Sequence, residues 1–181
     1  MSLKTAMSLL LGALCLFILF GCEVKTSAKL GSGPEFLLDG SGHLASFTVY
    51  APQPGHKIAT PNDTMSEVWS IQPEGGRGEV VARMNLLYGR VPTGYVQTVP
   101  TKGVAPAVMP GLVYSFFAQT TGAPGAGGVF YMDGAIPVLI NVPGLCESAF
   151  VGDVKPVKCG TSEQYVEPKD LEKFVQENRV R

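Results

Sequence analysis

Between residues 109 and 119 the chain runs Met-Pro-Gly-Leu-Val-Tyr-Ser-Phe-Phe-Ala-Gln, a Pro-Gly turn signal followed by a strongly strand-like segment. Tyr114, Phe116 and Ala118 are two residues apart and therefore share one face of that strand. Such alternation is typical of a strand with one face in the core. The segment predicts a β-strand over 112–119.

Similar segments lie on both sides of this one, and turn signals separate them. Pro100, Pro106 and Pro110 keep the stretch just before it out of any central strand. Asp133-Gly134 is a hairpin signal, because a type I′ turn needs positive φ at both central residues. The further strands are predicted at 36–38, 43–50, 65–71, 79–88, 90–98, 129–132 and 136–142. The residues predicted to face inward are Ala45, Phe47 and Val49 in the second of these strands, Met65, Trp69 and Ile71 in the third, and Val80, Ala82, Met84, Leu86 and Tyr88 in the fourth.

Only the C-terminal end has a helical pattern. Pro168-Lys169-Asp170 can open a short helix that places Leu171, Phe174 and Val175 on one side. A helix this short is not stable alone, so it must dock on the domain or fray. Strands without intervening helices predict an all-β fold, an antiparallel β-sandwich rather than βαβ units, followed by this short helix.

Residues 109–118 also resemble the part of fibronectin type III domains in which a Pro-Gly turn leads into a strand with the corner tyrosine. In that family the tyrosine hydroxyl bonds back to nearby backbone and holds the turn between the sheets. Tyr114 stands where that tyrosine would stand, and Trp69 where the early-strand core tryptophan would. The resemblance covers 43–132 and implies an immunoglobulin- or fibronectin-III-like sandwich, and residues 134–160 extend past the usual end of such a domain. It implies little about activity, because the fold binds proteins, sugars or nothing.

The N-terminus has the pattern of an exported lipoprotein. Lys4 precedes an almost unbroken apolar run over 9–20, and Gly21-Cys22 follows. These features are typical of a secretory signal peptide, and the run is shorter than a membrane span of about 20 residues. Leu19-Phe20-Gly21-Cys22 resembles the bacterial lipobox, in which the Cys thiol takes a diacylglycerol and the chain is cut just before it. Phe20 departs from the usual small or β-branched residue. The alternative is an N-terminal anchor that is not cleaved.

The chain then divides into four parts. Residues 1–21 are predicted to be the signal peptide, 22–34 a flexible tether, 35–160 the β-sandwich domain with a C-terminal disulfide loop, and 161–181 a tail with the short helix. Of 14 basic and 15 acidic residues, one basic residue leaves with the signal, so the mature chain has 13 and 15 and a net charge of −2. This charge, with no basic cluster, excludes nucleic acid, whose phosphates need Lys and Arg. In some bacteria an Asp directly after the lipidated Cys resembles an inner-membrane retention signal. Here Glu23 occupies that position. Its presence favours delivery to the outer membrane.

Two cysteines are left once the signal's Cys15 and the lipid site Cys22 are set aside. Cys146 and Cys159 belong to a chain predicted to lie outside the cytoplasm, where disulfides persist. A bridge between them would close a loop of about 15 residues, which contributes about 3 kcal/mol in the chain-entropy model. The two histidines lie far upstream without metal-ligand spacing. We therefore predict a structural disulfide, no metal and no cofactor.

The short motifs that suggest chemistry favour structural interpretations. Gly40-Ser41-Gly42-His43 places a Ser near a His, but it lacks the G-x-S-x-G elbow and is typical of a turn. The Gly-rich run 122–128 has no following Lys-Ser/Thr and no helix start, which argues against a phosphate cradle. We therefore predict no catalytic residues and no enzyme. The alternative is an envelope hydrolase or carbohydrate-active lipoprotein with an unrecognised site in the loops at 51–64, 99–110 or 120–128.

Phe117 and Tyr131 have the opposite parity to their inward-facing neighbours, so they are predicted to point to the outer face of the sheet. They form a candidate interaction patch for a partner, for the terminal helix or for residues 134–160, and we favour docking of the protein's own tail. Together with the leader, this predicts a non-enzymatic protein of the bacterial cell envelope. It is anchored in the membrane by lipid at Cys22, faces the periplasm or exterior, and acts as a binding or scaffold module for an envelope protein. A third interpretation, a subunit of a larger envelope complex, predicts a large exposed apolar patch.

Overall fold

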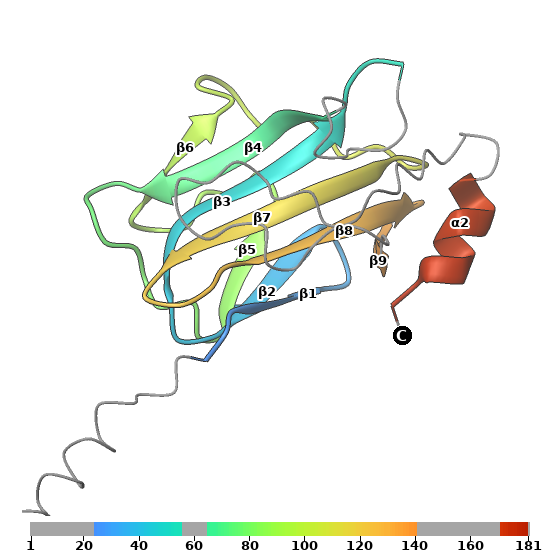
Figure 1. The fold of residues 1–181 in the computed structure, drawn as a ribbon. Helices are drawn as coiled ribbons and strands as arrows, with labels where there is room; N and C mark the ends of the chain where they lie inside the picture. Colours follow the sequence, from blue (N-terminus) through green and yellow to red (C-terminus); the bar gives the residue numbers. More distant parts are fainter. Residues whose placement is uncertain (1–23, 56–64, 141–170, 181) are drawn as a thin grey trace, which may run out of the picture.

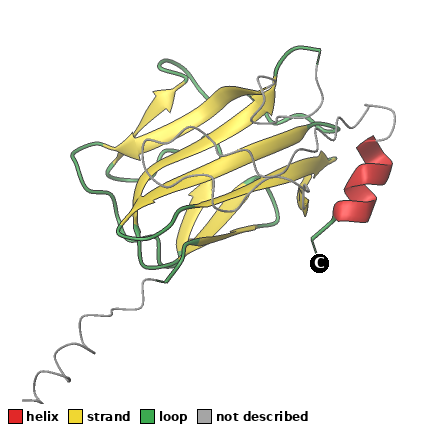
Figure 2. Ribbon diagram, in the orientation of Figure 1, coloured by secondary structure: helices red, strands yellow, loops and turns green. Residues whose placement is uncertain are grey.

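The computed structural model describes residues 24–55, 65–140 and 171–180, and in these residues the chain is all-β with one short helix (Figures 1 and 2). The pairings between neighbouring strands are antiparallel. The strands are β1 (Ser27–Leu30), β2 (Glu35–Asp39), β3 (His43–Pro52), β4 (Met65–Pro73), β5 (Met84–Leu87), β6 (Tyr95–Val99), β7 (Val113–Thr121), β8 (Ala126–Asp133) and β9 (Ile136–Ile140), and the helix is α2 (Leu171–Asn178).

The strands form two sheets that enclose one core. The smaller sheet has the order β1-β2-β5, and the larger has the order β6-β4-β3-β7-β8-β9. Both sheets contribute buried side chains to the same cluster, so the predicted all-β arrangement of two antiparallel sheets is confirmed, as is the short C-terminal helix. The cluster contains Phe36, Leu38 and Leu86 from the smaller sheet and Leu44, Phe47, Val49, Trp69, Ile71, Tyr95, Tyr114, Phe116, Ala118, Phe130 and Met132 from the larger one.

Phe36 of β2 joins the two sheets. It is fully buried, and its ring centroid lies 4.8 Å from that of Phe47, 4.9 Å from that of Phe116 and 5.7 Å from that of Phe130. Aromatic pairs with such tilted or edge geometry add about 0.5–1.5 kcal/mol beyond the burial of their area. Trp69 is also fully buried, with its ring 5.8 Å from that of Phe47. Its predicted place in the core is therefore confirmed.

The predicted alternation holds in β7 but not along the whole of β3. Tyr114, Phe116 and Ala118 are buried as expected. In β3 the register shifts just after Leu44, where one extra residue is inserted opposite β7. A bulge of this kind reverses the parity that faces the core. Leu44 is therefore fully buried in the core, whereas Ala45, which was predicted to face inward, is only partly buried.

A second bulge changes the face of Met65. Val49 lies opposite Trp69, but the next residue of β3 lies opposite Glu67, so β4 contains one extra residue here. The prediction that Met65 shares the inward face with Trp69 was therefore wrong. The sulfur of Met65 instead accepts a hydrogen bond of 3.8 Å from the hydroxyl of Ser115 on the outer face.

The strand predicted at 79–88 is only half present. β5 begins at Met84, and a tight turn precedes it. Val81 is fully buried, whereas Val80, which was predicted to face inward, is 45% exposed, and Ala82 is exposed as well. Because Val80 and Val81 are both apolar, the alternation of apolar residues does not show which of them faces the core. The alternation therefore gives no sign of the turn.

The segment predicted as a tether, 22–34, contains a strand of the domain. β1 pairs with β2 along its whole length. Ala28 and Leu30 are partly buried and pack against the core. The tether prediction was wrong for these residues, because two apolar side chains on a short edge strand are too weak a signal among small polar ones.

The segment 78–81 is hydrogen-bonded to the start of β3. The N–H of Leu44 donates to the carbonyl of Glu79 at 2.9 Å. Nδ1 of His43 donates to the carbonyl of Gly78, also at 2.9 Å. The loop between β4 and β5 is thereby fixed against the end of the larger sheet.

Gly78→Ala is expected to lower the free energy of unfolding by about 2–3 kcal/mol, the cost of overpacking a tight site. A Cβ at this position would collide with the carbonyl oxygen of Leu44 and lie 2.8 Å from the hydroxyl of Tyr95. In Gly75→Ala the added Cβ meets nothing within 4 Å, so that variant should stay within about 0.5 kcal/mol of the wild type. Urea unfolding measures both, and equal midpoints for the two variants would refute the close contact.

Two tyrosines connect the loop between β6 and β7 to the core. The N–H of Met109 donates to the hydroxyl of Tyr114 at 2.7 Å. The hydroxyl of Tyr88 donates to the carbonyl of Pro106 at 2.9 Å, and its ring packs against Trp69. Burial, with a smaller contribution from Tyr114, raises the pKa of Tyr88 to about 12.

The free energy of unfolding is expected to fall as pH rises from about 10 to about 12. Tyr88 keeps its proton in the folded chain up to about pH 12, whereas in the unfolded chain it loses the proton near its ordinary pKa of about 10. Above pH 10 the unfolded state therefore binds fewer protons, and alkali favours unfolding. Urea titrations at several pH values measure this slope. Tyr88→Phe should have a shallower slope, and an unchanged slope would contradict the assignment to Tyr88.

Candidate functional site

Phe117 and Tyr131 do lie on the outer face of the larger sheet, away from Phe36. Phe117 of β7 is paired with Thr48 of β3, and Tyr131 of β8 is paired with Val113 of β7. Both are partly buried. What covers these two side chains decides whether the patch is free to bind a partner.

Helix α2 covers the part of this face that β7, β8 and β9 form, which places it at the right of Figure 1. Leu171 and Val175 are buried on the sheet, and Phe174 and Tyr131 pack against the same cluster. The predicted apolar side of the helix is thus the side that docks, and for Tyr131 the covering element is the protein's own tail. The sheet residues of the cluster are Val113, Val129, Val138 and Ile140.

The chain after α2 lies along the free edge of β9. Arg179 forms a β-bridge with Ile140, and the N–H of Val180 donates to the carbonyl of Leu139 at 3.0 Å. An edge strand presents unpaired backbone groups that can pair with another chain. The C-terminal residues occupy part of this edge, so α2 and its tail together cover both a face and an edge of the larger sheet.

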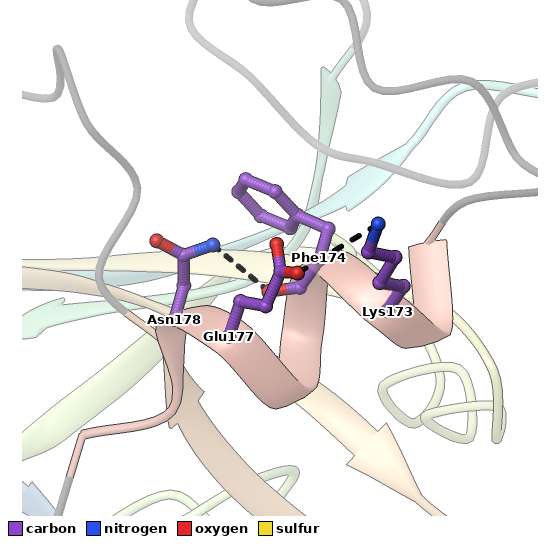
Figure 3. A network of polar contacts seen from close by, with 4 residues as sticks. All are labelled: Lys173, Phe174, Glu177 and Asn178. Carbon is purple, nitrogen blue, oxygen red and sulfur yellow. Dashed lines mark hydrogen bonds and ion pairs between the residues drawn. The ribbon is translucent and has the colours of Figure 1, made fainter.

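The outward side of α2 carries ordinary helix contacts rather than a reactive cluster (Figure 3). Lys173 and Glu177 form an exposed ion pair of 3.9 Å, and the Nδ2 of Asn178 donates to the carbonyl of Phe174 at 2.9 Å. An exposed pair of this kind contributes little to folding. Among the described residues, neither Lys173 nor Glu177 contacts a group that would make it a nucleophile or a general base.

An open pocket lies between α2 and the end of β8. It is lined by Tyr131, Asp133, Glu172, Lys173, Val175 and Gln176. Burial raises the pKa of Tyr131, and the charges of Glu172 and Asp133 raise it further. A phenol with a raised pKa stays protonated at neutral pH, so Tyr131 is not an activated base.

Phe117 lies over the backbone of its neighbouring strand. A Cβ added to Gly127 would lie 3.1 Å from the Phe117 ring, and one added to Gly125 would lie 3.2 Å from it. The ring therefore fills the space that two glycines of the β8 side leave open, an arrangement known to compensate glycines in sheets. Phe117 and Tyr131 share a face, but each is engaged by the protein itself.

Leu171→Asp is expected to release α2 from the sheet and to lower the free energy of unfolding by about 2 kcal/mol or more, because a carboxylate would be buried in an apolar cluster. The exposed sheet residues should bind a hydrophobic dye, and the amides of β9 should exchange faster. Gln176→Asp, on the exposed side of the helix, is the matched control and should change neither. Wild-type dye binding by Leu171→Asp would mean that α2 does not cover the face in solution.

The Ser–His pair of the sequence analysis has structural roles. The hydroxyl of Ser41 accepts the N–H of Val24 at 3.0 Å, and Nδ1 of His43 is bound to the carbonyl of Gly78. Each side chain is thus engaged with backbone of a neighbouring segment. The loops at 99–110 and 120–128, which were considered for a hydrolase site, contain no His, Asp or Glu.

Exposed apolar side chains lie instead at one end of the larger sheet, where the sequence predicted no interaction patch. The N–H of Gly111 donates to the carbonyl of Met132, so the end of the β6–β7 loop meets the β8–β9 hairpin at one end of the larger sheet. Here Met109 is 60% exposed and Ile136 is 58% exposed. Val104, farther along the same loop, is 85% exposed. We call the end with Met109 and Ile136 the distal end. The sequence does show apolar residues in Pro- and Gly-rich segments. Outside regular strands and helices, however, the spacing of apolar residues does not indicate which of them are exposed.

The remaining predicted sites lie outside the described residues. These are the lipid site Cys22, the disulfide partners Cys146 and Cys159, and most of the loop at 51–64 that belongs to the hydrolase alternative. Within the described ranges, no three His, Cys, Asp or Glu side chains are grouped so that they could hold a metal ion. The described helix is too short and too polar to cross a membrane.

Comparison of the chain with protein-family models, with curated proteins and with solved structures gives no match.

Proposed function

We propose that this protein is a lipid-anchored module of the bacterial cell envelope that binds or scaffolds an envelope protein without catalysing a reaction. The observation that carries the proposal is the arrangement at the N-terminus. An apolar run over 9–20 ends at Gly21-Cys22, and Val24 is already hydrogen-bonded to Ser41 of the folded domain. A leader followed at once by a cysteine and then by a domain is the layout of a lipoprotein. Placement outside the cytoplasm also favours a disulfide between Cys146 and Cys159.

The distal end is the part of the domain that best fits a binding role. Met109, on the β6–β7 loop, and Ile136, the first residue of β9 after the β8–β9 turn, expose large apolar side chains there. Loops held by a rigid sheet are where binding residues concentrate in β-sandwiches. The outer face of the sheet is a weaker candidate, since α2 covers Tyr131 and its neighbours.

We further propose that the domain is of the fibronectin-III or immunoglobulin-like type. A Pro-Gly turn leads into β7, and Tyr114 accepts the N–H of Met109 across this turn, which is the role of a corner tyrosine. Trp69 lies in the core as the family's tryptophan would. β9 and α2 lie beyond residue 132, where the resemblance ends.

Fractionation of native cells tests the proposed anchoring. The protein should sediment with the membranes, stay there through high salt and alkaline carbonate, and dissolve only in detergent, because acyl chains are buried in the bilayer. Density separation should then place it with the outer membrane. Recovery in the soluble fraction, or release by salt alone, would contradict the proposal.

A further inference from the structure

The first residues of the described chain are fixed to two turns of the sandwich. The N–H of Val24 donates to the hydroxyl of Ser41 at 3.0 Å, and the N–H of Ser41 donates to the carbonyl of Val24 at 3.2 Å. The N–H of Thr26 donates to the carbonyl of Pro124 at 3.1 Å, and Thr26 is buried. A Cβ on Gly40 would lie 2.8 Å from the Cα of Thr26, so chain and turn are in close contact. We call the turns 40–42 and 121–125 the proximal end.

The path from the proposed lipid to this end is very short. Cys22 is two residues before Val24, and two residues of extended chain span at most about 7 Å. A lipid on Cys22 would therefore hold the proximal end within a few ångströms of the headgroups. The predicted tether, which would have lifted the domain off the membrane, is replaced by β1.

The proximal end has a surface that suits close approach to a bilayer. The turns 40–42 and 121–125 consist of Gly, Ser, Thr, Ala and Pro and carry no charged side chain. Ser41, Thr121, Gly122 and Pro124 are exposed. The turns themselves bring no charge to the headgroups, whereas a charged turn would carry a desolvation penalty. The exposed Lys25 and Asp39 flank the turns and can stay hydrated at the headgroup level.

We propose that the domain stands on the bilayer by its proximal end, which fixes the direction in which the distal end is presented. This inference rests on the lipid anchor proposed above. β3 has 10 residues and runs from the proximal toward the distal end, so its length of about 33 Å at about 3.3 Å per residue separates the two ends. Met109 and Ile136 then face away from the membrane and can meet only a partner that reaches the domain from the aqueous side. In Figure 1 the described chain starts at the lower left and α2 lies at the right.

Photo-crosslinking to lipid tests the orientation. A benzophenone amino acid is placed at position 121, at the proximal end, or at position 136, at the distal end, in the full chain made in cells that add the lipid. The purified proteins are put into phosphatidylethanolamine–phosphatidylglycerol vesicles with labelled acyl chains and irradiated. Labelling at position 121 should exceed that at position 136 several-fold. Thermal unfolding and the intact mass confirm that each variant is folded and carries lipid.

A linker variant separates the short anchor from a general affinity for lipid. About ten Gly and Ser residues inserted after Cys22 would span about 17 Å on average. Labelling at position 121 should then fall toward that at position 136, although lipid and domain are unchanged. With lipid present on Cys22, equal labelling, stronger labelling at 136 or no labelling at either position would overturn the orientation alone. A mass without lipid would overturn the proposed anchor itself.

Discussion

Cys22→Ala is expected to move the protein almost completely from the membrane fraction to the soluble fraction or to leave it as an uncleaved precursor. The thiol is the only group at this position that can take a diacylglycerol, and each acyl CH₂ in the bilayer contributes about 0.8 kcal/mol. Fatty chains with many such groups hold a protein to the membrane, so their loss changes partitioning by orders of magnitude. Immunoblots of separated fractions measure the change.

Cys15→Ala is the matched control, because it removes a thiol from the same apolar run without touching position 22. Cys15 is expected to leave with residues 1–21, so this variant should fractionate like the wild type and have the same mature mass. If Cys22→Ala also stayed in the membrane fraction with the wild-type mobility, the lipid would not be the anchor. The alternative of an uncleaved N-terminal anchor would then be favoured.

Phe36→Ala is expected to lower the free energy of unfolding by about 3–5 kcal/mol, the cost of removing a buried phenylalanine. The side chain is fully buried, and its ring contacts three others, those of Phe47, Phe116 and Phe130. Those three belong to the larger sheet, so the cavity would open between the two sheets. Since small domains are stable by only about 5–15 kcal/mol, the variant should be close to unfolding. Urea denaturation followed by fluorescence of Trp69 measures the loss.

Leu37→Ala controls for changes in β2 that do not involve the core. Leu37 is the next residue along the strand, points to the opposite face and is 41% exposed. It should cost far less than Phe36→Ala, within about 1 kcal/mol, because little buried area is lost. Similar losses for both variants would mean that the two sheets are not joined through Phe36.

The sequence predicts the fold best where the register is unbroken. In β7 each residue from Tyr114 to Ala118 takes the face that its parity assigns. The bulges beside Leu44 and Glu67 each insert one residue, so Ala45 and Met65 lose the inward positions that a continuous period of two gave them. A bulge depends on how a strand pairs with its neighbour. The pattern of apolar residues in one strand carries no information about that neighbour, so it does not predict a bulge.

The surfaces were predicted less completely than the core. The apolar side of the helix at Leu171 and Val175 was visible as spacing, and it docks where the tail was expected. Met109 and Ile136 are exposed because of how the β6–β7 loop packs against the β8–β9 hairpin. The pairing of β1 depends on the free edge of β2. These features depend on contacts between distant segments, which local periodicity does not encode.

The proposed lipid anchor and the proposed orientation of the domain both depend on what happens to residues 1–22 after synthesis. The intact mass of the protein purified from its native membrane, with fragmentation of its N-terminal peptide, measures this directly. A chain that begins at position 22 and carries the added mass of a diacylglycerol on the cysteine, with or without a further acyl group, is the predicted result. A chain that still has residues 1–21 and no added mass at Cys22 would contradict the lipid anchor, and with it the orientation of the domain on the membrane.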